Sequence, residues 1–484
     1  MINNEIAKKK VFVETFGCQM NVYDSEVASG LLEQAGFELV GNGEAPHLTP
    51  NASSTAREAI GAPLRADIFL MNTCSVREHA EQKVYSRLGA LGKIKKTNPN
   101  MIIGLMGCMV EEHKEKLFKR FPALDLMVGT RNIKELPALI EEVRRTRRQT
   151  SRIKQDGISI EYTDLIKRDS SFHAWLPIMT GCDKVCTYYI VPITRGAEVS
   201  MPAREVYREA SRLVEEGVQW ITLLGQNVNS YNGSGVIPAK AGIQEFGSPT
   251  KTFGDDKNDI KFPELLEMLC EIEGLKRISF TTSHPHDATE DLFKVIAKNP
   301  KISRRFHLPL QSGSNKILKR MKRLHTYDEY KAKIDRLREL VPDIAITTDI
   351  IAGFSGETDE DHEATMKALS EIKYDSAYIY KYSVRQQTPA AKLPDDVPLE
   401  IKEKRNDELL SLQKKIIQEV SQKWLGRTVN VFVEEESTKT PGCVLGRTDQ
   451  DRKVVFEGGP DLIGQFISVR LQELHFETFR GKLI

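Results

Sequence analysis

The chain lacks three features that would place it quickly in a broad class. No uninterrupted apolar run in its 484 residues approaches the roughly 18 residues of a membrane-spanning helix, so we expect no membrane association. The first ten residues, MINNEIAKKK, are polar with no apolar run behind them, so we expect no signal peptide and a cytoplasmic protein. The net charge is only +1, so any binding of nucleic acid must come from local basic patches.

Cysteine is also scarce, and its number argues against disulfides. The chain has seven cysteines, an odd count. Because the cytoplasm keeps thiols reduced, metal binding or catalysis is the favoured use for them. The length allows two to four domains of roughly 100–200 residues each.

One cysteine is missing from a recognisable pattern. Residues 181–196 read GCDKVCTYYIVPITRG, with Cys182 and Cys186 four apart and Tyr189 three further on. A cysteine at 189 would complete C-x-x-x-C-x-x-C, a spacing that places three thiolates around one iron–sulfur cube with an open iron. A phenolate is a hard oxygen donor with an ordinary pKa near 10, a poor match for a site that selects soft thiolates. Read alone, Cys182 and Cys186 are either two cluster ligands or an incidental pair.

The first 150 residues alternate between predicted strands and helices. The expected strands are 11–16, 68–71, 101–106 and 124–128, and the expected helices are 22–35, 76–91, 111–121 and 133–143. This alternation predicts an α/β domain with a parallel sheet and crossover helices.

Three cysteines follow three of these strands at the same place. Cys18, Cys74 and Cys108 each come just after a strand end. Because the carboxyl ends of parallel strands lie on one edge of a sheet, we expect the three thiols to meet there. Three convergent thiolates suit an iron–sulfur cluster with one open iron. The alternative is three buried cysteines that behave as small hydrophobic residues.

Residues 170–396 predict a second α/β region. Its expected strands include 220–224, 277–281, 306–309, 344–351 and 376–381, and its expected helices include 203–216, 264–272, 316–321, 327–340 and 359–372. Roughly six β/α units predict a partial barrel whose site lies at the strand carboxyl ends. We expect the cysteine loop at 182–189 to follow the first strand of this barrel.

Polar residues near these strand ends are candidates for cofactor contact. Gln311 and His307 lie at one strand end, and Asp349 and Glu357 flank the turn IIAGFSG, whose glycines suggest close approach of the backbone to a ligand. We predict Gln311, Asp349 and Glu357 as cofactor-binding residues. A satisfied structural histidine is the alternative for His307, and no catalytic residue is predicted.

The last part of the chain predicts a helix followed by a small β-barrel. Residues 400–423 read as a charged amphipathic helix with Leu409, Leu412, Ile416 and Val420 on one face. Short β-rich runs at 429–433, 453–456 and 466–471 predict the barrel. Three basic clusters are either phosphate contacts or solvated helix faces: Arg144, Arg145, Arg147 and Arg148; Lys93, Lys95 and Lys96; Lys319, Arg320, Lys322 and Arg323.

Many segments resemble the methylthiotransferase family of radical S-adenosylmethionine enzymes, over almost the entire chain. The matching segments include ETFGCQMN at 14–21, NTCSVREHAEQKV at 72–84, GCDKVCTY at 181–188, IVPITRG at 190–196, TTSHP at 281–285, HLPLQSGSN at 307–315 and GFSGET at 353–358. Within the family, the segment after NTC is similar to the branch that acts on tRNA carrying an isopentenylated adenosine beside the anticodon.

The resemblance implies an architecture and a set of cofactors. It implies an N-terminal cluster domain at 9–149, a radical partial barrel at 168–398, a linking helix at 399–424 and a TRAM-like RNA-binding β-barrel at 425–484. It implies one [4Fe–4S] cluster on Cys18, Cys74 and Cys108, and a second on Cys182, Cys186 and the residue at 189. The second cluster of the family cleaves S-adenosylmethionine, and the resulting radical abstracts hydrogen from C2 of the adenine. The implied partners are the tRNA anticodon stem-loop and an electron donor such as flavodoxin or ferredoxin, and we expect a monomer.

The sequence departs from the family pattern at several positions. Tyr189 replaces a ligand, Ser355 replaces a proline, and residues 43–65 and 233–258 read as insertions. We therefore expect the fold and the RNA affinity to survive while turnover is impaired. Two alternatives stay open: a homologue that binds tRNA and one auxiliary cluster without turnover, and, disfavoured by the residues SVRE after NTC, a methylthiotransferase for a ribosomal protein.

Overall fold

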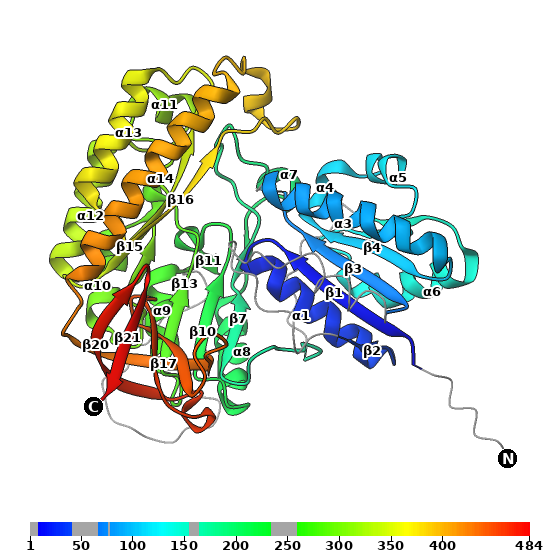
Figure 1. The fold of residues 1–484 in the computed structure, drawn as a ribbon, viewed down its shortest axis with the longest axis horizontal. Helices are drawn as coiled ribbons and strands as arrows, with labels where there is room; N and C mark the ends of the chain where they lie inside the picture. Colours follow the sequence, from blue (N-terminus) through cyan, green and yellow to red (C-terminus); the bar gives the residue numbers. More distant parts are fainter. Residues whose placement is uncertain (1–7, 41–65, 76–77, 154–163, 234–258) are drawn as a thin grey trace. The chain divides into compact units, whose positions relative to one another are not determined.

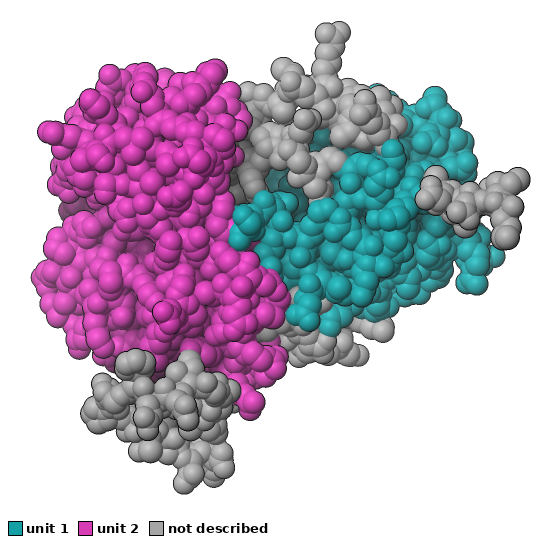
Figure 2. Space-filling model, turned by 90° about the horizontal axis from the view of Figure 1, so that it is seen from below, with its two compact units in different colours: residues 1–171, 180–183, 190–199 teal, residues 172–179, 184–189, 200–484 magenta. Residues whose placement is uncertain are grey.

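The computed structural model describes residues 8–40, 66–75, 78–153, 164–233 and 259–484. It divides into two compact units, distinguished by colour in Figure 2. Unit 1 comprises residues up to 171 together with 180–183 and 190–199, and unit 2 comprises 172–179, 184–189 and 200–484. Both predicted insertions fall, except for residue 233, outside the described residues. Among the helices that are described, none is long and apolar enough to cross a membrane.

Unit 1 is built on a six-stranded parallel sheet in the order β2-β1-β3-β4-β5-β6 (Figure 1). The strands are β1 (Lys10–Phe16), β2 (Glu38–Leu39), β3 (Ile68–Thr73), β4 (Ile102–Gly107), β5 (Leu126–Val128) and β6 (Thr150–Arg152). Every neighbouring pair is parallel. The predicted parallel sheet is therefore confirmed, and it gains the short edge strands β2 and β6.

The helices of unit 1 follow the predicted alternation with one correction. They are α1 (Gln19–Gln34), α3 (Glu78–Thr97), α4 (Cys108–His113), α5 (Lys116–Arg120), the 3-10 turn η2 (Ile133–Glu135), α6 (Leu136–Thr146) and the short α7 (Val191–Thr194). The single helix expected at 111–121 is wrong, because the chain breaks at Lys114, which has a φ of 48°. Residues 111–116 are all charged or histidine, so no apolar side chain anchors a continuous helix there. The chain turns instead, and α5 buries Leu117.

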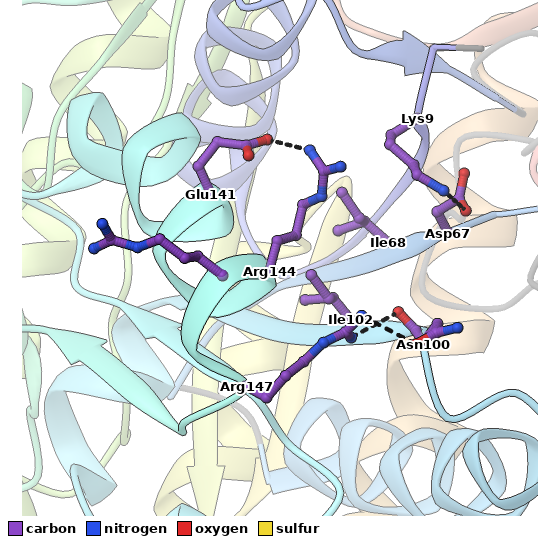
Figure 3. Close-up of a pocket in the computed structure, with 9 residues that line it drawn as sticks. Lys9, Asp67, Ile68, Asn100, Ile102, Glu141, Arg144 and Arg147 are labelled. Carbon is purple, nitrogen blue, oxygen red and sulfur yellow. Dashed lines mark hydrogen bonds and ion pairs between the residues drawn. The ribbon is translucent and has the colours of Figure 1, made fainter. Parts of the chain in front are cut away.

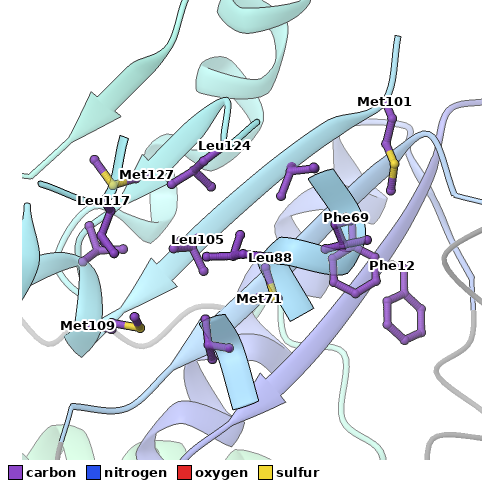
Figure 4. Close-up of a cluster of buried hydrophobic side chains, with 14 of the residues drawn as sticks. Phe12, Phe69, Met71, Leu88, Met101, Leu105, Met109, Leu117, Leu124 and Met127 are labelled. Atoms are coloured by element: carbon purple, nitrogen blue, oxygen red, sulfur yellow. The ribbon is translucent and has the colours of Figure 1, made fainter. Parts of the chain in front are cut away.

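The core of unit 1 lies against the two central strands. All six residues of β3 and all six of β4 are buried, as is typical of parallel strands covered on both faces. Figure 4 shows one face of this core, where Phe69 and Met71 of β3 lie beside Leu105 of β4 and Leu88 of α3. Burial on both faces therefore fixes β3 and β4 in place, and it also fixes the residues that follow these two strands.

Unit 2 contains six parallel strands in two sheets, ordered β13-β10-β7 and β14-β15-β16. They are β7 (His173–Pro177), β10 (Trp220–Leu224), β13 (Arg277–Phe280), β14 (Arg305–His307), β15 (Ala345–Ala352) and β16 (Ser376–Lys381). An isolated parallel bridge between Ile278 of β13 and Ile302 joins the two sheets into one series. The predicted partial barrel is therefore confirmed, and β7 is the strand that precedes the cysteine loop.

Four of the helices of this partial barrel, α10 to α13, begin after a serine or threonine whose side chain accepts a backbone hydrogen bond. They are α8 (Ala203–Glu215), α9 (Phe262–Cys270), α10 (Glu290–Lys298), α11 (Asn315–Arg320), α12 (Tyr327–Leu340) and α13 (Asp359–Ile372). Thr326 and Thr358 each form a capping box with the acidic residue three positions on.

Short strands lie between the main elements: β8 (Met179–Thr180), β9 (Val199–Ser200), β11 (Asn232–Gly233) and β12 (Ile260–Lys261).

The linking helix α14 (Leu399–Gln422) forms as predicted, but its buried face is more polar than expected. Leu409 and Ile416 are buried, whereas Leu412 and Val420 are only half-buried. Lys402 and Arg405 are buried as well. Arg405 donates to Glu357 at 3.0 Å and to Asp359 at 2.7 Å, so ion pairs supplement the apolar contacts of this helix.

The last five strands form a closed barrel, in the order β17-β18-β19-β21-β20. They are β17 (Thr428–Glu436), β18 (Cys443–Thr448), β19 (Lys453–Glu457), β20 (Phe466–His475) and β21 (Thr478–Leu483). The predicted small β-barrel is confirmed. β18 and β21 were not predicted because each is a short strand that is interrupted by a glycine, Gly446 in β18 and Gly481 in β21.

The closed barrel attaches to the partial barrel through the turn between β18 and β19, residues 449–452. Asp449 accepts a hydrogen bond at 2.6 Å from Arg277, at the start of β13. Asp451 lies 3.2 Å from Arg305, at the start of β14, and Arg452 pairs with Asp375, just before β16. The Arg277 guanidinium also lies over the rings of Trp220 and Phe432. The two barrels of unit 2 are therefore joined by buried charges as well as by aromatic rings.

Candidate metal centres

The structure brings the thiols of Cys18, Cys74 and Cys108 to one edge of the unit 1 sheet. Cys18 stands between β1 and α1, Cys74 follows β3, and Cys108 opens α4 directly after β4. These three strands are neighbours, since β1 pairs with β3 and β3 with β4. The Cys18 thiol hydrogen-bonds with that of Cys74, and this contact lowers the pKa of Cys18 to about 6. That the three thiols hold a cluster stays a prediction.

Two glycines and two asparagines shape this edge. A Cβ at Gly17 would lie 2.6 Å from the Asn21 side chain and 2.9 Å from Cβ of Cys74. Gly107 has a φ of 95°, and a Cβ there would lie 2.4 Å from Asn72. Asn21 donates to Asn72 at 2.8 Å, and Asn72 donates back to the Asn21 carbonyl at 2.7 Å. The Gly-Cys pairs of the sequence therefore reflect crowding by the asparagines that support the thiols.

Arg195 lies among the thiols and was not predicted from the sequence. It is buried and donates to Asp24 at 2.8 Å. Burial alone would lower the pKa of Arg195, but Cys108, Asp24 and Cys18 together raise it well above its ordinary value. The guanidinium therefore stays charged beside the sulfur atoms. The signal that could have identified it is its place in the segment IVPITRG, which the family resemblance includes.

The second cysteine motif is divided between the two units. Cys182 is buried in unit 1, where its N–H donates to the carbonyl of Gly196 at 3.1 Å. Cys186 is buried in unit 2, where Arg323 donates to its sulfur at 3.4 Å. Arg323 also donates to the carbonyl of Pro309 at 2.8 Å. The Cys186 sulfur thus has a fixed positive charge beside it, supplied by the turn after α11.

His284 approaches the Cys186 sulfur from a different segment. Its Nε2 lies 4.0 Å from that sulfur, and its Nδ1 accepts a hydrogen bond from the N–H of His286 at 3.2 Å. Burial, with Arg323 adding to it, lowers the pKa of His284 far below its ordinary value. The ring is therefore neutral with its hydrogen on Nε2, directed at the sulfur as a donor rather than as a metal ligand.

Tyr189 lies one turn beyond Cys186. Its N–H donates to the carbonyl of Cys186 at 3.2 Å, and its ring is half-buried at 6.3 Å from the ring of Tyr188. The backbone turn that the spacing C-x-x-C requires is thus present, and it carries a phenol at the third position. The side chain at that position therefore offers a hard oxygen in place of soft sulfur.

The three predicted cofactor residues lie at or near β15. Gln311 is buried with a φ of 75°, and its backbone pairs with Asp349 and Ile351. Asp349 is half-buried, with its carboxylate 3.5 Å from Nε2 of His307. Glu357 is buried and accepts from Arg405 and from the N–H of Gly353 at 2.9 Å, so its carboxylate serves to hold α14. Cofactor contact at these three residues stays a prediction.

The glycine turn after β15 lies close to the linking helix. Gly353 has a φ of 72°, and a Cβ there would lie 2.3 Å from the Lys402 side chain. Close packing of α14 therefore accounts for the glycine at 353, and ligand contact at this turn stays a prediction.

The basic clusters separate into exposed and internal groups. Arg144, Arg145 and Arg147 line a pocket of about 390 Å³ at the amino ends of β1, β3 and β4, which Figure 3 shows. Arg147 reaches Asn100 at 3.0 Å and Arg144 reaches Glu141 at 2.5 Å. Arg323 in contrast is buried against Cys186, so it is not a candidate for phosphate contact. Lys95 is paired with Asp125.

Family models match all three parts of the chain. The model described as "Radical SAM superfamily" matches residues 176–369. The model described as "Uncharacterized protein family UPF0004" matches 10–59 and 48–129, and the model "TRAM domain" matches 422–484. The domain limits predicted from the sequence contain or nearly contain these segments, but they stay predictions.

Curated relatives match over the full length. The chain is 40% identical over 477 residues to the tRNA-2-methylthio-N(6)-dimethylallyladenosine synthase of Dictyoglomus thermophilum, covering 98% of each chain. It is 38% identical over 481 residues to the protein of the same name from Carboxydothermus hydrogenoformans, covering 99% of this chain and 100% of that one. A solved radical S-adenosylmethionine methyltransferase, TsrM, from Kitasatospora setae aligns over 79% of this chain and 77% of that one at 13% identity and a TM-score of 0.49.

Family membership implies a [4Fe–4S] cluster and S-adenosylmethionine for the partial barrel, and a second cluster for the N-terminal domain. With its three matched segments and its full-length relatives, the chain belongs to the radical S-adenosylmethionine tRNA methylthiotransferases, the enzyme family of the tRNA-2-methylthio-N(6)-dimethylallyladenosine synthases.

Proposed function

We propose that this protein adds a methylthio group to C2 of N6-dimethylallyladenosine, the isopentenylated adenosine next to the tRNA anticodon. The observation that carries the proposal is the 40% identity to a synthase of that name over 98% of both chains. The same relatives make a ribosomal-protein substrate the weaker alternative. The proposed partners are the tRNA anticodon stem-loop and an electron donor such as flavodoxin or ferredoxin, and the proposed state is a cytoplasmic monomer.

The N-terminal thiols fit an iron–sulfur cluster. Cys18, Cys74 and Cys108 supply three soft donors from three adjacent strands, and no carboxylate or imidazole is needed to complete the set. Arg195 offsets the negative charge that three thiolates would concentrate in a buried place. In this proposal the three cysteines hold the auxiliary cluster, whose chemistry is the supply of sulfur.

The donors of the barrel fit the radical cluster less well. Cys182 and Cys186 supply two thiols, whereas the third position carries the phenol of Tyr189. The two remaining cysteines belong to other elements: Cys270 ends α9, and Cys443 begins β18 of the closed barrel. Neither is therefore proposed as the third ligand of the radical cluster. Arg323 and His284 both donate toward Cys186, so neither offers a lone pair to iron.

We therefore propose that catalytic turnover of this chain is impaired, because the third ligand position of the radical cluster holds Tyr189. The second candidate function, favoured by Tyr189 alone, is a protein that binds tRNA and the auxiliary cluster without cleaving S-adenosylmethionine. The two candidates share the fold and differ in the redox step.

Iron and sulfide content separates the two candidates. About eight iron atoms per reconstituted chain support two clusters, and about four support the auxiliary cluster alone. Release of 5′-deoxyadenosine after reduction tests cleavage directly, and mass spectrometry of nucleosides from the treated tRNA tests the methylthio product. Robust release by the unaltered chain would contradict the proposed impairment, and absence of the product with a two-cluster protein would contradict the proposed substrate.

A further inference from the structure

The loops that follow β10 and β13 are bonded to each other at the carboxyl ends of these strands. The first loop contains the 3-10 turn η3 (Val228–Ser230), and the second contains η4 (Pro285–Asp287). Thr282 has a φ of 65°, which is rare for a β-branched residue, and its hydroxyl donates to the carbonyl of Gly225. The N–H of Val228 donates to the carbonyl of Thr282 at 2.9 Å. A strained residue persists only where its surroundings fix it, so the two loops form a stiff support.

Asp287, the last residue of η4, binds side chains from two other segments. Its carboxylate accepts from Lys184 at 2.8 Å and from Asn227 at 2.6 Å, and it lies 3.0 Å from Nδ1 of His286. Burial alone would raise the pKa of Asp287, but the hydrogen bonds from these three side chains lower it below its ordinary value. The side chains of Lys184 and Asp287 are only 18% and 14% exposed, so this pair differs from the exposed ion pairs that contribute little.

Asn227 connects the same carboxylate to the sulfur of Cys186. Its side-chain N–H donates to Asp287, and its side-chain oxygen accepts from the backbone N–H of His284 at 2.9 Å. Nε2 of His284 lies 4.0 Å from the sulfur of Cys186. One carboxylate therefore reaches the segment 184–189 of unit 2 at two points, directly at its first residue and indirectly at Cys186.

A second set of contacts, from other elements, also holds the segment 184–189. The N–H of Thr187 donates to the carbonyl of Met321 at 3.0 Å, and its hydroxyl donates to the carbonyl of Arg320 at 3.2 Å. The carbonyl of Thr187 accepts from the N–H of Ala390 at 2.8 Å. These contacts do not involve the loops after β10 and β13, so loss of the Asp287 carboxylate would loosen the segment without detaching it.

We infer that Asp287 is a positioning residue for the thiol of Cys186. It restrains the segment 184–189 directly, through the lysine at 184, and indirectly, through the asparagine and the histidine that lead to the sulfur. The inference deepens the proposed function, on which it rests, because Cys186 is a proposed cluster ligand of the partial barrel. The competing interpretation is an ion pair that contributes only to the general stability of unit 2.

The rate at which iodoacetamide alkylates each cysteine measures this restraint. The full chain is used before cluster reconstitution, and mass spectrometry of its peptides separates the cysteines. Cys186 is buried, so it reacts when the segment around it opens, and its rate reports the equilibrium of local opening. Lys184→Met removes a hydrogen bond to a charged group and accelerates alkylation of Cys186 by about 10- to 100-fold. Asp287→Asn, which weakens both connections, accelerates it at least as much.

Four controls separate positioning from general stability. Cys443, buried in the closed barrel of the same unit, keeps its alkylation rate in both variants. Lys184→Arg keeps the charge and the slow rate at Cys186. The double variant, Lys184→Met with Asp287→Asn, reacts no faster than Asp287→Asn alone, because both changes remove the same contact. Asp291→Asn alters an exposed carboxylate on α10 and leaves the rate at Cys186 unchanged.

Two results would overturn the inference. One is an unchanged rate at Cys186 in both Lys184→Met and Asp287→Asn. The other is an equal acceleration at Cys186 and Cys443, which would assign Asp287 to the general stability of unit 2. The proposed function fails separately, in the iron content and the 5′-deoxyadenosine release of the unaltered chain, because the alkylation rates need no cluster. A selective acceleration at Cys186 in a chain that assembles only one cluster would support the positioning role of Asp287 and contradict the second cluster.

Discussion

The three-thiol site of unit 1 and the Cys186 site of unit 2 both place buried sulfur beside a buried arginine, yet they are built differently. In unit 1 each thiol follows a different strand, and the register of β1, β3 and β4 sets their positions. In unit 2 the sulfur of Cys186 lies in a loop, where a backbone turn to Tyr189 sets the next donor position. A single substitution in such a loop removes one donor while the fold, the arginine and the remaining sulfur stay in place.

The arginines differ as well. Arg195 is paired with the buried carboxylate of Asp24, whereas Arg323 contacts a carbonyl and a sulfur. The unit 1 site is therefore a network of opposite charges in its own right. The guanidinium of the unit 2 site faces the sulfur of Cys186, the carbonyl of Pro309 and the phenol of Tyr188, and it forms no ion pair with a carboxylate of the described residues. Substitutions in each of the two sites test this comparison.

The largest effect is expected from breaking the unit 1 site. Cys74→Ala removes one of three sheet-borne donors, so the auxiliary cluster is lost and iron content falls by about four atoms per chain. Methylthio product disappears entirely. Cys270→Ala, at the end of α9, is the control and leaves iron content unchanged. An unchanged iron content in Cys74→Ala would contradict the assignment.

The next effect is a gain at the unit 2 site. Under the proposed impairment, Tyr189→Cys supplies a third soft donor, so release of 5′-deoxyadenosine rises by about tenfold or more, which is at least about 1.4 kcal/mol in the barrier. Tyr189→Phe removes the phenol without adding a thiol, and release stays at the level of the unaltered chain. If the cysteine and phenylalanine variants behave alike, the proposed impairment at Tyr189 is wrong.

A third test compares the two arginines. Arg195→Gln leaves Asp24 buried without its partner and lowers the free energy of unfolding by about 3–5 kcal/mol. Arg323→Gln leaves no buried carboxylate behind and costs about 1–3 kcal/mol. Urea unfolding followed by circular dichroism measures both. Equal losses in the two variants would mean that the Asp24 pair adds nothing to the stability of unit 1.

The smallest effect concerns pH and the helix that leads away from the unit 1 site. Burial, with the charge of Asp169, raises the pKa of Glu26 on α1 from its ordinary value of 4.5 to about 8. The folded protein therefore holds a proton that the unfolded chain releases, so Glu26 lowers stability progressively as pH rises from 4.5 to about 8. Glu26→Gln removes this loss, on the order of 1–3 kcal/mol. Urea midpoints at about pH 5 and about pH 8 check it, and an equal pH dependence in both proteins would refute it.

Much of the fold follows from patterns that are local in the sequence. The alternation of apolar runs and helical periods predicts both sheets, because parallel strands need continuous burial and helices need a repeating face. The positions of Cys18, Cys74 and Cys108 follow from the same reasoning, since strand ends share one edge. These predictions depend only on what each segment does by itself and on the rule that parallel strands align.

What the sequence did not predict depends on contacts between distant segments. Arg195 and Arg323 lie beside sulfur atoms from segments that are far from them in the chain, and no periodicity distinguishes them from surface arginines. Lys402 and Arg405 look like solvated helix positions until Asp395 and Glu357 are placed beside them. Sequence periodicity therefore does not predict which charged side chains are buried. A charged side chain is buried only where the fold places a partner beside it, and that partner is often distant in the sequence.

The turn between β18 and β19 has a consequence for the movement of the closed barrel. Since Asp449, Asp451 and Arg452 hold the closed barrel against the starts of β13 and β14 and against Asp375 before β16, the two barrels of unit 2 form one body. Any movement that separates the closed barrel from the partial barrel therefore has to break the contacts of Asp449, Asp451 and Arg452 together.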